Sequence, residues 1–179
     1  MKDFERINSL FSLCGLNCRL CSMKLSGHCG GCGFGNQSCK IAKCSLEHNK
    51  IEYCFQCEEY PCSKYESIEL FDSFIIHRNQ KIDMLKAQKI GIEFYNAEQT
   101  EKSKFLNILL SNYNSGREKT LYCLAVNLFE VDEIKEVLAM TENNTYLCGK
   151  SVKEKADYVK KQLQALAEKN GVELKLRKK

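Results

Sequence analysis

Ten cysteines lie within one 49-residue stretch, and this clustering constrains the fold more than any other feature of the sequence. The chain has 179 residues and 12 cysteines, of which only Cys123 and Cys148 lie outside residues 14–62. The same stretch has few apolar runs and holds six of the ten glycines. A segment with so little to bury does not offset its ordering entropy through a hydrophobic core alone. Crosslinks or bound metal must therefore hold it together.

The spacing of these cysteines favours metal ligation. Three C-x-x-C pairs occur, and two intervening residues let a tight turn direct both sulfur atoms at one ion. Glycines surround the second pair, as a sharp chain reversal requires. We expect all ten clustered cysteines to be metal ligands, with the three pairs Cys18/Cys21, Cys29/Cys32 and Cys54/Cys57 the safest; the others are Cys14, Cys39, Cys44 and Cys62.

The grouping of these ligands stays open at the level of sequence. Ten thiols supply two four-cysteine sites with two thiols left over, or one cluster with shared thiolates. Combining Cys29/Cys32 with Cys54/Cys57 gives C-x2-C-x21-C-x2-C, which is close to a zinc-ribbon spacing. The spacing does not decide between these arrangements.

Three histidines and two further cysteines need separate interpretations. His28 and His48 lie inside the cysteine cluster and are candidate ligands, although an exposed histidine is the commoner case. His77 falls in an expected helix and is interpreted as structural. Cys123 and Cys148 are expected to be buried free thiols that act as small apolar side chains.

Zinc is the metal that the pattern favours, with two or more ions, and an iron–sulfur cluster is the alternative, because four thiolates bind both. Cys14, Cys18 and Cys21 also match the C-x3-C-x2-C spacing of radical enzymes that cleave S-adenosylmethionine. That chemistry normally sits on a β/α barrel, and no alternation of strands and helices follows the motif here.

Composition indicates a folded protein and sets the expected compartment. Hydrophobic residues make up 44% and charged residues 28%, and the formal net charge of +4 is too weak to imply nucleic acid by itself. We find no apolar stretch long enough for a membrane span and no secretory signal in the first 20 residues. We therefore expect a cytoplasmic protein, where thiols stay reduced and a disulfide scaffold is not favoured.

The rest of the chain has helical patterns. We predict a small Cys-rich metal-bound module over residues 1–62 and a mostly α-helical region over residues 63–179 packed against it, with few or no strands. Expected helices cover residues 2–13, 63–90 with a break at Gly91, 93–113, 119–129, a segment from Asp132, and 151–170. Residues 172–176 alternate in polarity and suit a short strand or an extended tail.

Two S-x-x-E capping boxes mark helix starts, at Ser63/Glu66 and at Ser151/Glu154. The apolar run over residues 119–129 fits a buried helix or a buried strand, and the helix is favoured because another helix follows almost at once. In the expected helix over 93–113, the inward side chains are Phe94, Ala97, Phe105, Ile108 and Leu109.

The cysteine cluster as a whole resembles the DUF3795 family of cysteine-rich prokaryotic proteins. That family opens with CGL-x-C-x-x-C and closes with C-x-E-C-x-x-Y-P-C, matched here by residues 14–21 and by CFQCEEYPC over residues 54–62. Gln56 departs from the acidic residue common in the closing motif. The resemblance extends to about residue 90 and implies a fold and a bound metal, but no reaction.

Several functions are compatible with these features. A structural-zinc module that binds another protein or acts as an adaptor is favoured, because no H-E-x-x-H, G-x-S-x-G or phosphate-loop motif is present. The alternatives are a redox or metal sensor and an enzyme with an open metal site. Residues 150–179 carry a local charge of +6, but they lack interleaved aromatic residues, so nucleic acid is not the expected partner.

Overall fold

The computed structural model describes residues 1–34 and 38–178. It divides the chain into two compact units: unit 1 comprises Met1–Gln99 and Leu176–Lys179, and unit 2 comprises Thr100–Lys175. The boundary between them lies within helix α4 (Ile92–Asn112). The described part of the chain contains helices and irregular segments but no strand, so the mostly helical fold class is confirmed and residues 172–176 do not form a strand.

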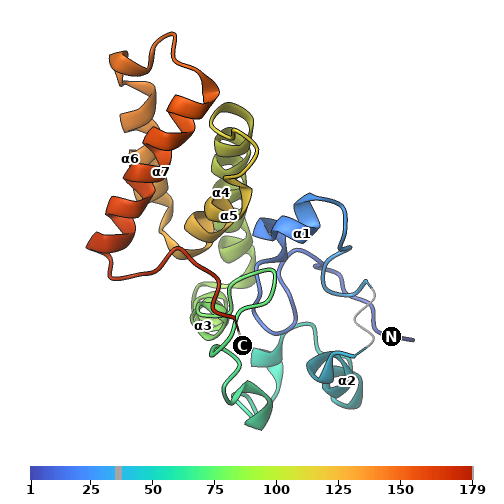
Figure 1. Cartoon of the computed structure of the whole chain (residues 1–179). Coiled ribbons are helices and arrows are strands. Elements are labelled where there is room, and N and C mark those ends of the chain that lie inside the picture. The colour runs from blue at the N-terminus through green and yellow to red at the C-terminus, as the bar shows by residue number, and fades with distance from the viewer. Residues whose placement is uncertain (35–37, 179) are drawn as a thin grey trace. The chain divides into compact units, whose positions relative to one another are not determined.

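Unit 1 consists of short helices joined by long irregular segments (Figure 1). Its elements before α4 are η1 (Cys18–Leu20), α1 (Ser22–Leu25), α2 (Lys40–Glu47), η2 (Cys54–Gln56), η3 (Ser63–Tyr65) and α3 (Gln80–Ile90). Its core combines aromatic rings with cysteines. The buried members include Phe4, Phe11, Cys32, Tyr53, Cys54, Tyr65 and Tyr95.

Aromatic and polar contacts attach the N-terminal loops to α4. The ring centroid of Phe11 lies 4.6 Å from that of Tyr95 and 5.7 Å from that of Tyr53. The buried Asn17 amide donates to the Tyr95 hydroxyl at 2.9 Å and to Asp83 Oδ2 at 3.0 Å. The cysteine-rich loops are therefore packed on α3 and α4 within the same unit.

The helix expected over residues 2–13 is absent, and that prediction is wrong. The Arg6 guanidinium donates to the Glu52 carbonyl and, at 2.9 Å, to the Phe11 carbonyl. The Asn8 side-chain oxygen accepts from the Phe11 N–H at 3.1 Å. Side-chain hydrogen bonds, both local and to the distant Glu52, have replaced the regular main-chain pattern that the apolar spacing predicts.

The long helix expected from Ser63 is also wrong over its first part. The single 3-10 turn η3 follows Cys62, and the next helix begins only at Gln80. Glu66, which the capping box requires in helical geometry, is extended, and Ser67 has a φ of +59°. A left-handed residue ends a right-handed helix, so the turn does not continue.

Side-chain hydrogen bonds hold the segment over residues 66–79. Asp72 Oδ1 accepts from the His77 N–H at 2.7 Å, and Asp72 Oδ2 accepts from the Arg177 N–H at 2.8 Å. The Arg177 guanidinium also donates to the Glu69 carbonyl. His77, expected on a helix, therefore lies in an irregular segment instead, where it is partly buried.

Helix α4 confirms the helix expected over residues 93–113, and the expected break falls at Gly91. Gly91 has a φ of +89°, a conformation that side chains with a Cβ rarely adopt. Phe94 and Ala97 are exposed rather than inward, and Tyr95 is fully buried. Leu109 is fully buried as predicted, and Phe105 and Ile108 are half-buried, so the predicted inward face is wrong only in the first part of the helix.

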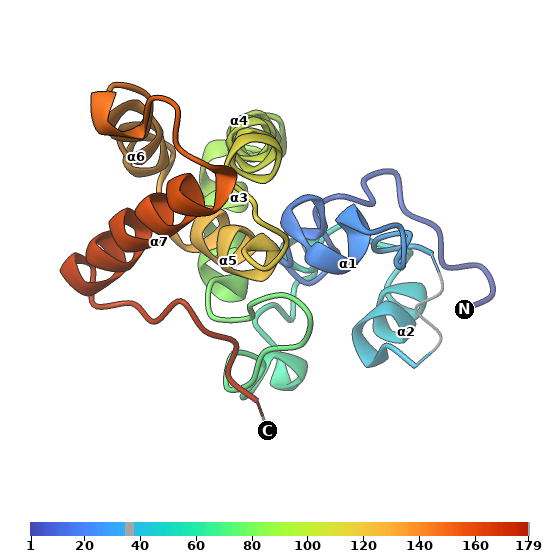
Figure 2. The ribbon, with the colours of Figure 1, turned by 45° about the horizontal axis from the view of Figure 1, so that its top comes forward.

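Unit 2 is built from the helices that the sequence predicts. After α4 come α5 (Lys119–Leu128), α6 (Val131–Glu142), η4 (Thr145–Leu147) and α7 (Val152–Lys169). Helices α6 and α7 lie side by side in both views (Figures 1 and 2). The ambiguous apolar run over residues 119–129 forms α5, which confirms the helical interpretation, with residues 122–127 buried.

The capping box at Ser151 forms as predicted. Ser151 Oγ accepts from the Glu154 N–H at 3.3 Å, and Glu154 Oε2 accepts from the Ser151 N–H at 3.0 Å. The buried side chains of α7 follow at helical spacing: Ala156, Val159, Leu163 and Ala167.

No helix within residues 1–34 and 38–178 has the length and apolar character needed to cross a lipid bilayer.

Candidate metal centre

The ten clustered cysteines all belong to unit 1, and none of the chain's cysteines forms a disulfide. Within the cluster, Cys21, Cys32 and Cys54 are buried, whereas Cys29 is exposed. The remaining six are partly buried. The unit therefore contains reduced sulfur atoms in and around its core.

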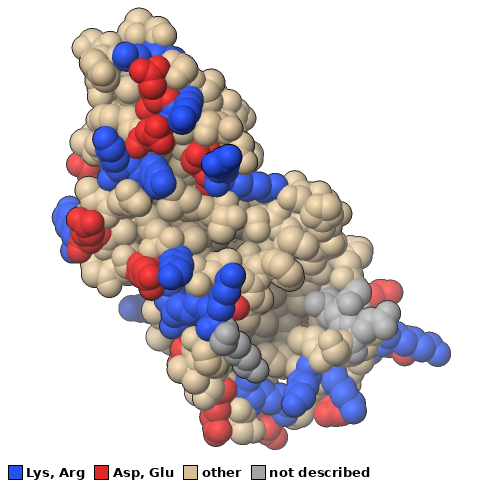
Figure 3. Space-filling view, in the orientation of Figure 1, with Lys and Arg blue, Asp and Glu red and all other residues tan. Residues whose placement is uncertain are grey.

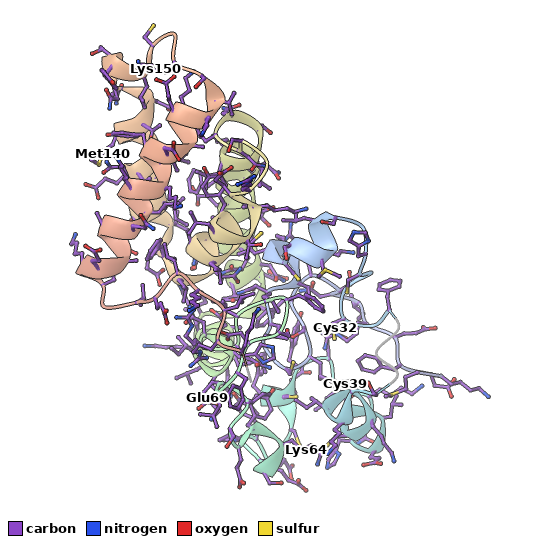
Figure 4. All side chains as sticks on the ribbon, viewed as in Figure 1. Cys32, Cys39, Lys64, Glu69, Met140 and Lys150 are labelled. Carbon is purple, nitrogen blue, oxygen red and sulfur yellow. The ribbon has the colours of Figure 1, made fainter. Side chains whose placement is uncertain are left out.

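Four cysteines from separate segments come together in what we call group A: Cys14, Cys18, Cys32 and Cys39. Burial, together with the thiols of Cys32 and Cys39, raises the pKa of Cys14 to about 11. Burial, together with the thiols of Cys32 and Cys14, raises the pKa of Cys18 to about 12. Figure 4 labels Cys32 and Cys39 on the segments that precede α2 and lead into it. We group these four thiols on their electrostatic effects, in each of which Cys32 takes part.

Hydrogen-bond donors are directed at the sulfur atoms of group A. The Ala42 N–H donates to Cys39 Sγ at 3.4 Å, since Cys39 is the N-cap residue of α2. Ser12 Oγ lies 3.3 Å from Cys14 Sγ, while the main-chain N–H of Cys32 donates to the Ser9 carbonyl at 3.2 Å. Such donors favour the ionised thiolate, the form that binds metal.

A buried cation lies beside the same group. The Arg6 side chain is 1% exposed, and its Nη2 lies 3.3 Å from Glu52 Oε1. Burial raises the pKa of Cys32, and the Arg6 charge opposes that rise. A guanidinium in this position offsets part of the negative charge of thiolate ligands.

Four other cysteines line a small cavity of about 20 Å³ in unit 1, and we call them group B: Cys44, Cys54, Cys57 and Cys62. Cys44 comes from α2, Cys54 and Cys57 from the turn of η2, and Cys62 from the residue before η3. Burial, together with the thiols of Cys14, Cys62 and Cys44, raises the pKa of Cys54 to about 12. The other walls of the cavity include the side chains of Ile41, Ile51, Tyr60 and Tyr65. A space of this size holds one water-sized particle.

Two side chains that sequence reasoning missed complete the walls of this cavity. Tyr65 is 2% exposed, and its hydroxyl has no hydrogen-bond partner at normal geometry, although it lies close enough to Cys54 for each to influence the pKa of the other. The Lys64 ammonium, labelled in Figure 4, bonds the Cys44 thiol, and this contact raises the pKa of Lys64. No sequence motif identifies either residue as part of the site. Their position directly after Cys62 is the one sequence feature that points to them.

The C-x-x-C pairs are divided by this arrangement. Cys32 joins group A, but its pair member Cys29 is exposed and accepts from the nearby Gly31 N–H at 3.4 Å. Cys21 lies beside Cys18 at the margin of group A. The structure thus places Cys32 in group A and the Cys54/Cys57 pair in group B, a different grouping from the ribbon-type combination.

The histidines differ in their relation to the thiols. His28 is exposed. His48 Nδ1 lies 2.9 Å from the Cys44 carbonyl oxygen and 3.6 Å from Cys44 Sγ, and its Nε2 lies 3.7 Å from Glu59 Oε1. His48 is therefore a neighbour of group B, held mainly by the main chain of its own helix.

The two cysteines outside the cluster lie in unit 2. Cys123 is buried in α5, as predicted for a thiol that acts as an apolar side chain. Cys148 is exposed, so the same prediction is wrong for it. It follows η4 directly, where the chain turns before α7.

The chemistry of the two groups fits a thiophilic metal ion. Each supplies four sulfur donors, and the cavity of group B presents a buried hydroxyl that lacks a partner. Within residues 1–34 and 38–178, however, no three His, Cys, Asp or Glu side chains are already arranged to hold a metal ion. Binding therefore requires the sulfur atoms of each group to move closer together than they are here.

Acidic side chains accompany the basic ones in the described part of residues 150–178. Lys and Arg are interspersed with Asp and Glu over α6 and α7 on the face shown in Figure 3. Lys150 Nζ lies 3.1 Å from Glu154 Oε1, one helical turn apart in sequence. This i,i+4 spacing is typical of a solvated helix face.

Comparison of the chain with protein-family models, with curated proteins and with solved structures gives no match. The resemblance to the DUF3795 family therefore stays a prediction that rests on the cysteine motifs.

Proposed function

We propose that unit 1 is a metal-binding module in which cysteine thiolates bind zinc, and that this zinc has a structural role. One observation carries the proposal: four cysteines from three separate segments line one small cavity without forming disulfides, and the thiols of four more cysteines in the same unit are linked by their effects on one another's pKa. Structural zinc sites typically have four such ligands in closed tetrahedral coordination.

The short helices of unit 1 support a structural need for metal. Helix α1 has 4 residues and α2 has 8, lengths at which an isolated helix is not stable in water. Bound zinc supplies crosslinks between the loops that carry its ligands. We infer that metal binding and folding of this segment are coupled, as they are in other small metal-dependent modules.

The buried thiols set a proton requirement for binding. Burial holds the pKa of Cys14, Cys18 and Cys54 well above the ordinary thiol range, so these groups are protonated at neutral pH without metal. Each must lose its proton to act as a ligand. Zinc affinity is thus expected to rise with pH.

The test is elemental analysis of the protein purified under reducing conditions, together with its visible absorption spectrum. Zinc in at least one equivalent per chain and a colourless solution support the proposal. A brown solution that contains iron and sulfide identifies the iron–sulfur alternative and overturns the zinc assignment. Absence of bound metal, with failure to take up zinc from solution, overturns the whole proposal.

A role in protein binding, favoured at the sequence level, forms the second part of this proposal. It is supported by the absence of a recognisable catalytic motif in the sequence and by an exposed apolar segment that includes Leu70, Phe71 and Phe74. Exposed apolar side chains that lie close together are typical of contact surfaces. Redox sensing and catalysis at an open metal site stay alternatives. Metal release by mild peroxide would indicate redox sensing, and an ion with only three protein ligands would indicate an open catalytic site.

A further inference from the structure

Group B has the features of a site by itself. Its four cysteines line one cavity, and the other side chains of that wall are largely apolar. The cavity volume of about 20 Å³ suits one small particle and not an extended cluster of ions. The three segments that supply the cysteines are α2, the turn of η2 and the residue before η3.

Two donors face these cysteines from the chain that directly follows Cys62. The Tyr65 hydroxyl is buried beside Cys54 without a normal hydrogen bond, and the Lys64 ammonium bonds the Cys44 thiol. A divalent ion with four thiolates carries a net charge of about −2, and hydrogen bonds to the sulfurs stabilise that charge. A metal-bound Cys54 thiolate satisfies the hydroxyl that is otherwise left without a partner.

Group A adjoins this site. Cys14 is influenced most strongly, among thiols, by Cys32 and Cys39, whereas the thiol with the largest influence on Cys54 is Cys14, ahead of Cys62 and Cys44. The two groups are therefore adjacent, and the feature that sets group B apart is the one cavity that its four cysteines line. Both Cys54 and Cys14 influence Tyr65, so its hydroxyl lies where the two groups come closest. The ring of Tyr65 belongs to the buried core of unit 1.

From this arrangement we propose that Cys44, Cys54, Cys57 and Cys62 form a self-contained zinc site, distinct from the site of group A, with Tyr65 and Lys64 as hydrogen-bond donors to its thiolates. This inference rests on the proposed zinc binding of unit 1. It assigns one ion to each group and leaves Cys29 and His48 outside both sites.

The experiment measures zinc equivalents per full-length chain by elemental analysis. We expect two for the natural sequence, one for the double variant Cys57→Ser/Cys62→Ser and one for Cys18→Ser/Cys39→Ser. Cys29→Ser, His48→Ala and Cys148→Ser serve as matched controls and are expected to retain two. Loss of both ions, or of neither, in the Cys57→Ser/Cys62→Ser protein overturns separate sites. A zinc loss in the Cys29→Ser control also overturns the assignment.

The donors are tested with variants that keep all ligands. Tyr65→Phe and Lys64→Ala are expected to retain two zinc ions but to release one of them to a chromogenic chelator faster, with an affinity loss of about 10- to 100-fold. Adding Cys57→Ser/Cys62→Ser to either variant must abolish this fast phase. Release kinetics identical to those of the natural protein overturn the role of the two donors.

The two levels of the proposal fail differently. Natural protein that neither contains nor takes up zinc overturns the proposed function itself. Natural protein that binds zinc in a single all-or-none cluster, lost completely from either double variant, leaves zinc binding intact and overturns only the separation into two sites.

Discussion

Two segments of the chain begin with the same S-x-x-E pattern and fold differently. At Ser151 the pattern forms a capping box and opens the 18-residue helix α7. At Ser63 it produces one 3-10 turn, after which the chain is irregular until Gln80. Local sequence thus determines the structure in unit 2, whereas long-range contacts override it in unit 1.

The same difference extends over the two units. Unit 2 has regular helices with buried side chains at helical spacing, such as those of α7. Unit 1 has short helices and a core that contains thiols, and its loops are connected by side-chain contacts such as that between Arg6 and Glu52. We therefore expect the units to respond differently to metal, to core truncation and to loss of a cap.

Metal removal is expected to produce the largest difference in stability between the two units. Treating the reduced protein with a strong chelator should lower hydrogen-exchange protection over residues 14–62 by about 100-fold or more, because zinc binding supplies much of the folding free energy of such modules. Amides of residues 100–175 should keep their protection. Unchanged protection over residues 14–62 would show that the core of unit 1 is sufficient without metal.

Core truncation in unit 2 should have the next largest effect. Leu163 is fully buried in α7, and Leu163→Ala is expected to reduce the free energy of unfolding by about 2–5 kcal/mol in urea titration. The control Gln164→Ala changes an exposed neighbour and should alter it by less than about 0.5 kcal/mol. Zinc content should stay the same in both. A Leu163→Ala protein that loses zinc would contradict the independence of the units.

Acid should weaken the contact between Asp72 and Arg177 in unit 1. Burial by itself would raise the pKa of Asp72, but hydrogen bonds from Arg177 and from the His77 N–H hold it below its usual value. A carboxyl group whose pKa is lower in the folded protein than in the unfolded chain, where it is about 4, stabilises the folded state at pH values above that unfolded pKa. This stabilisation is lost as the pH falls through the folded pKa.

The variant Asp72→Asn removes this contact at neutral pH. We expect a loss of about 1–2 kcal/mol at pH 7 and a smaller difference from the natural protein below about pH 4. Glu66→Gln is the exposed control. Equal destabilisation by Asp72→Asn at pH 7 and at pH 3 would exclude a role for the carboxylate charge.

Replacing the serine of each S-x-x-E pattern is expected to have the smallest effect and compares the two patterns directly. Ser151→Ala should reduce stability by about 1 kcal/mol, since it removes the N-cap of α7. Ser63→Ala should change it by less than about 0.5 kcal/mol, because the exposed Ser63 caps no helix. Both values come from thermal or urea unfolding. Equal losses in the two variants would mean that a helix forms after Ser63 in solution.

These contrasts explain which parts of the fold the sequence predicts. The apolar run over residues 119–129 and the cap at Ser151 act within a few residues, so α5 and α7 were predictable. The irregular segment over residues 66–79 depends on Arg177, which lies more than 100 positions away from it. No local pattern contains such a partner.

The candidate site was predictable in its composition but not in its grouping. Cysteine spacing identifies the segment, because metal ligation needs several thiols close in sequence. It does not show that Cys32 turns toward Cys39 while Cys29 stays exposed, because that choice depends on how the loops pack on the core of unit 1. Tyr65 becomes part of the site for the same reason, since its position follows from the core rather than from a motif.

The return of residues 176–178 to unit 1 makes that unit discontinuous, with unit 2 as an insertion between its two parts. Ribosomes synthesise a chain from its N-terminus, so Arg177 emerges only after the whole of unit 2. Until then, Asp72 lacks its hydrogen bonds with Arg177, and the segment around Asp72 lacks that support. A fragment that ends at residue 99 would carry all ten clustered cysteines and still lack this last contact of its own unit.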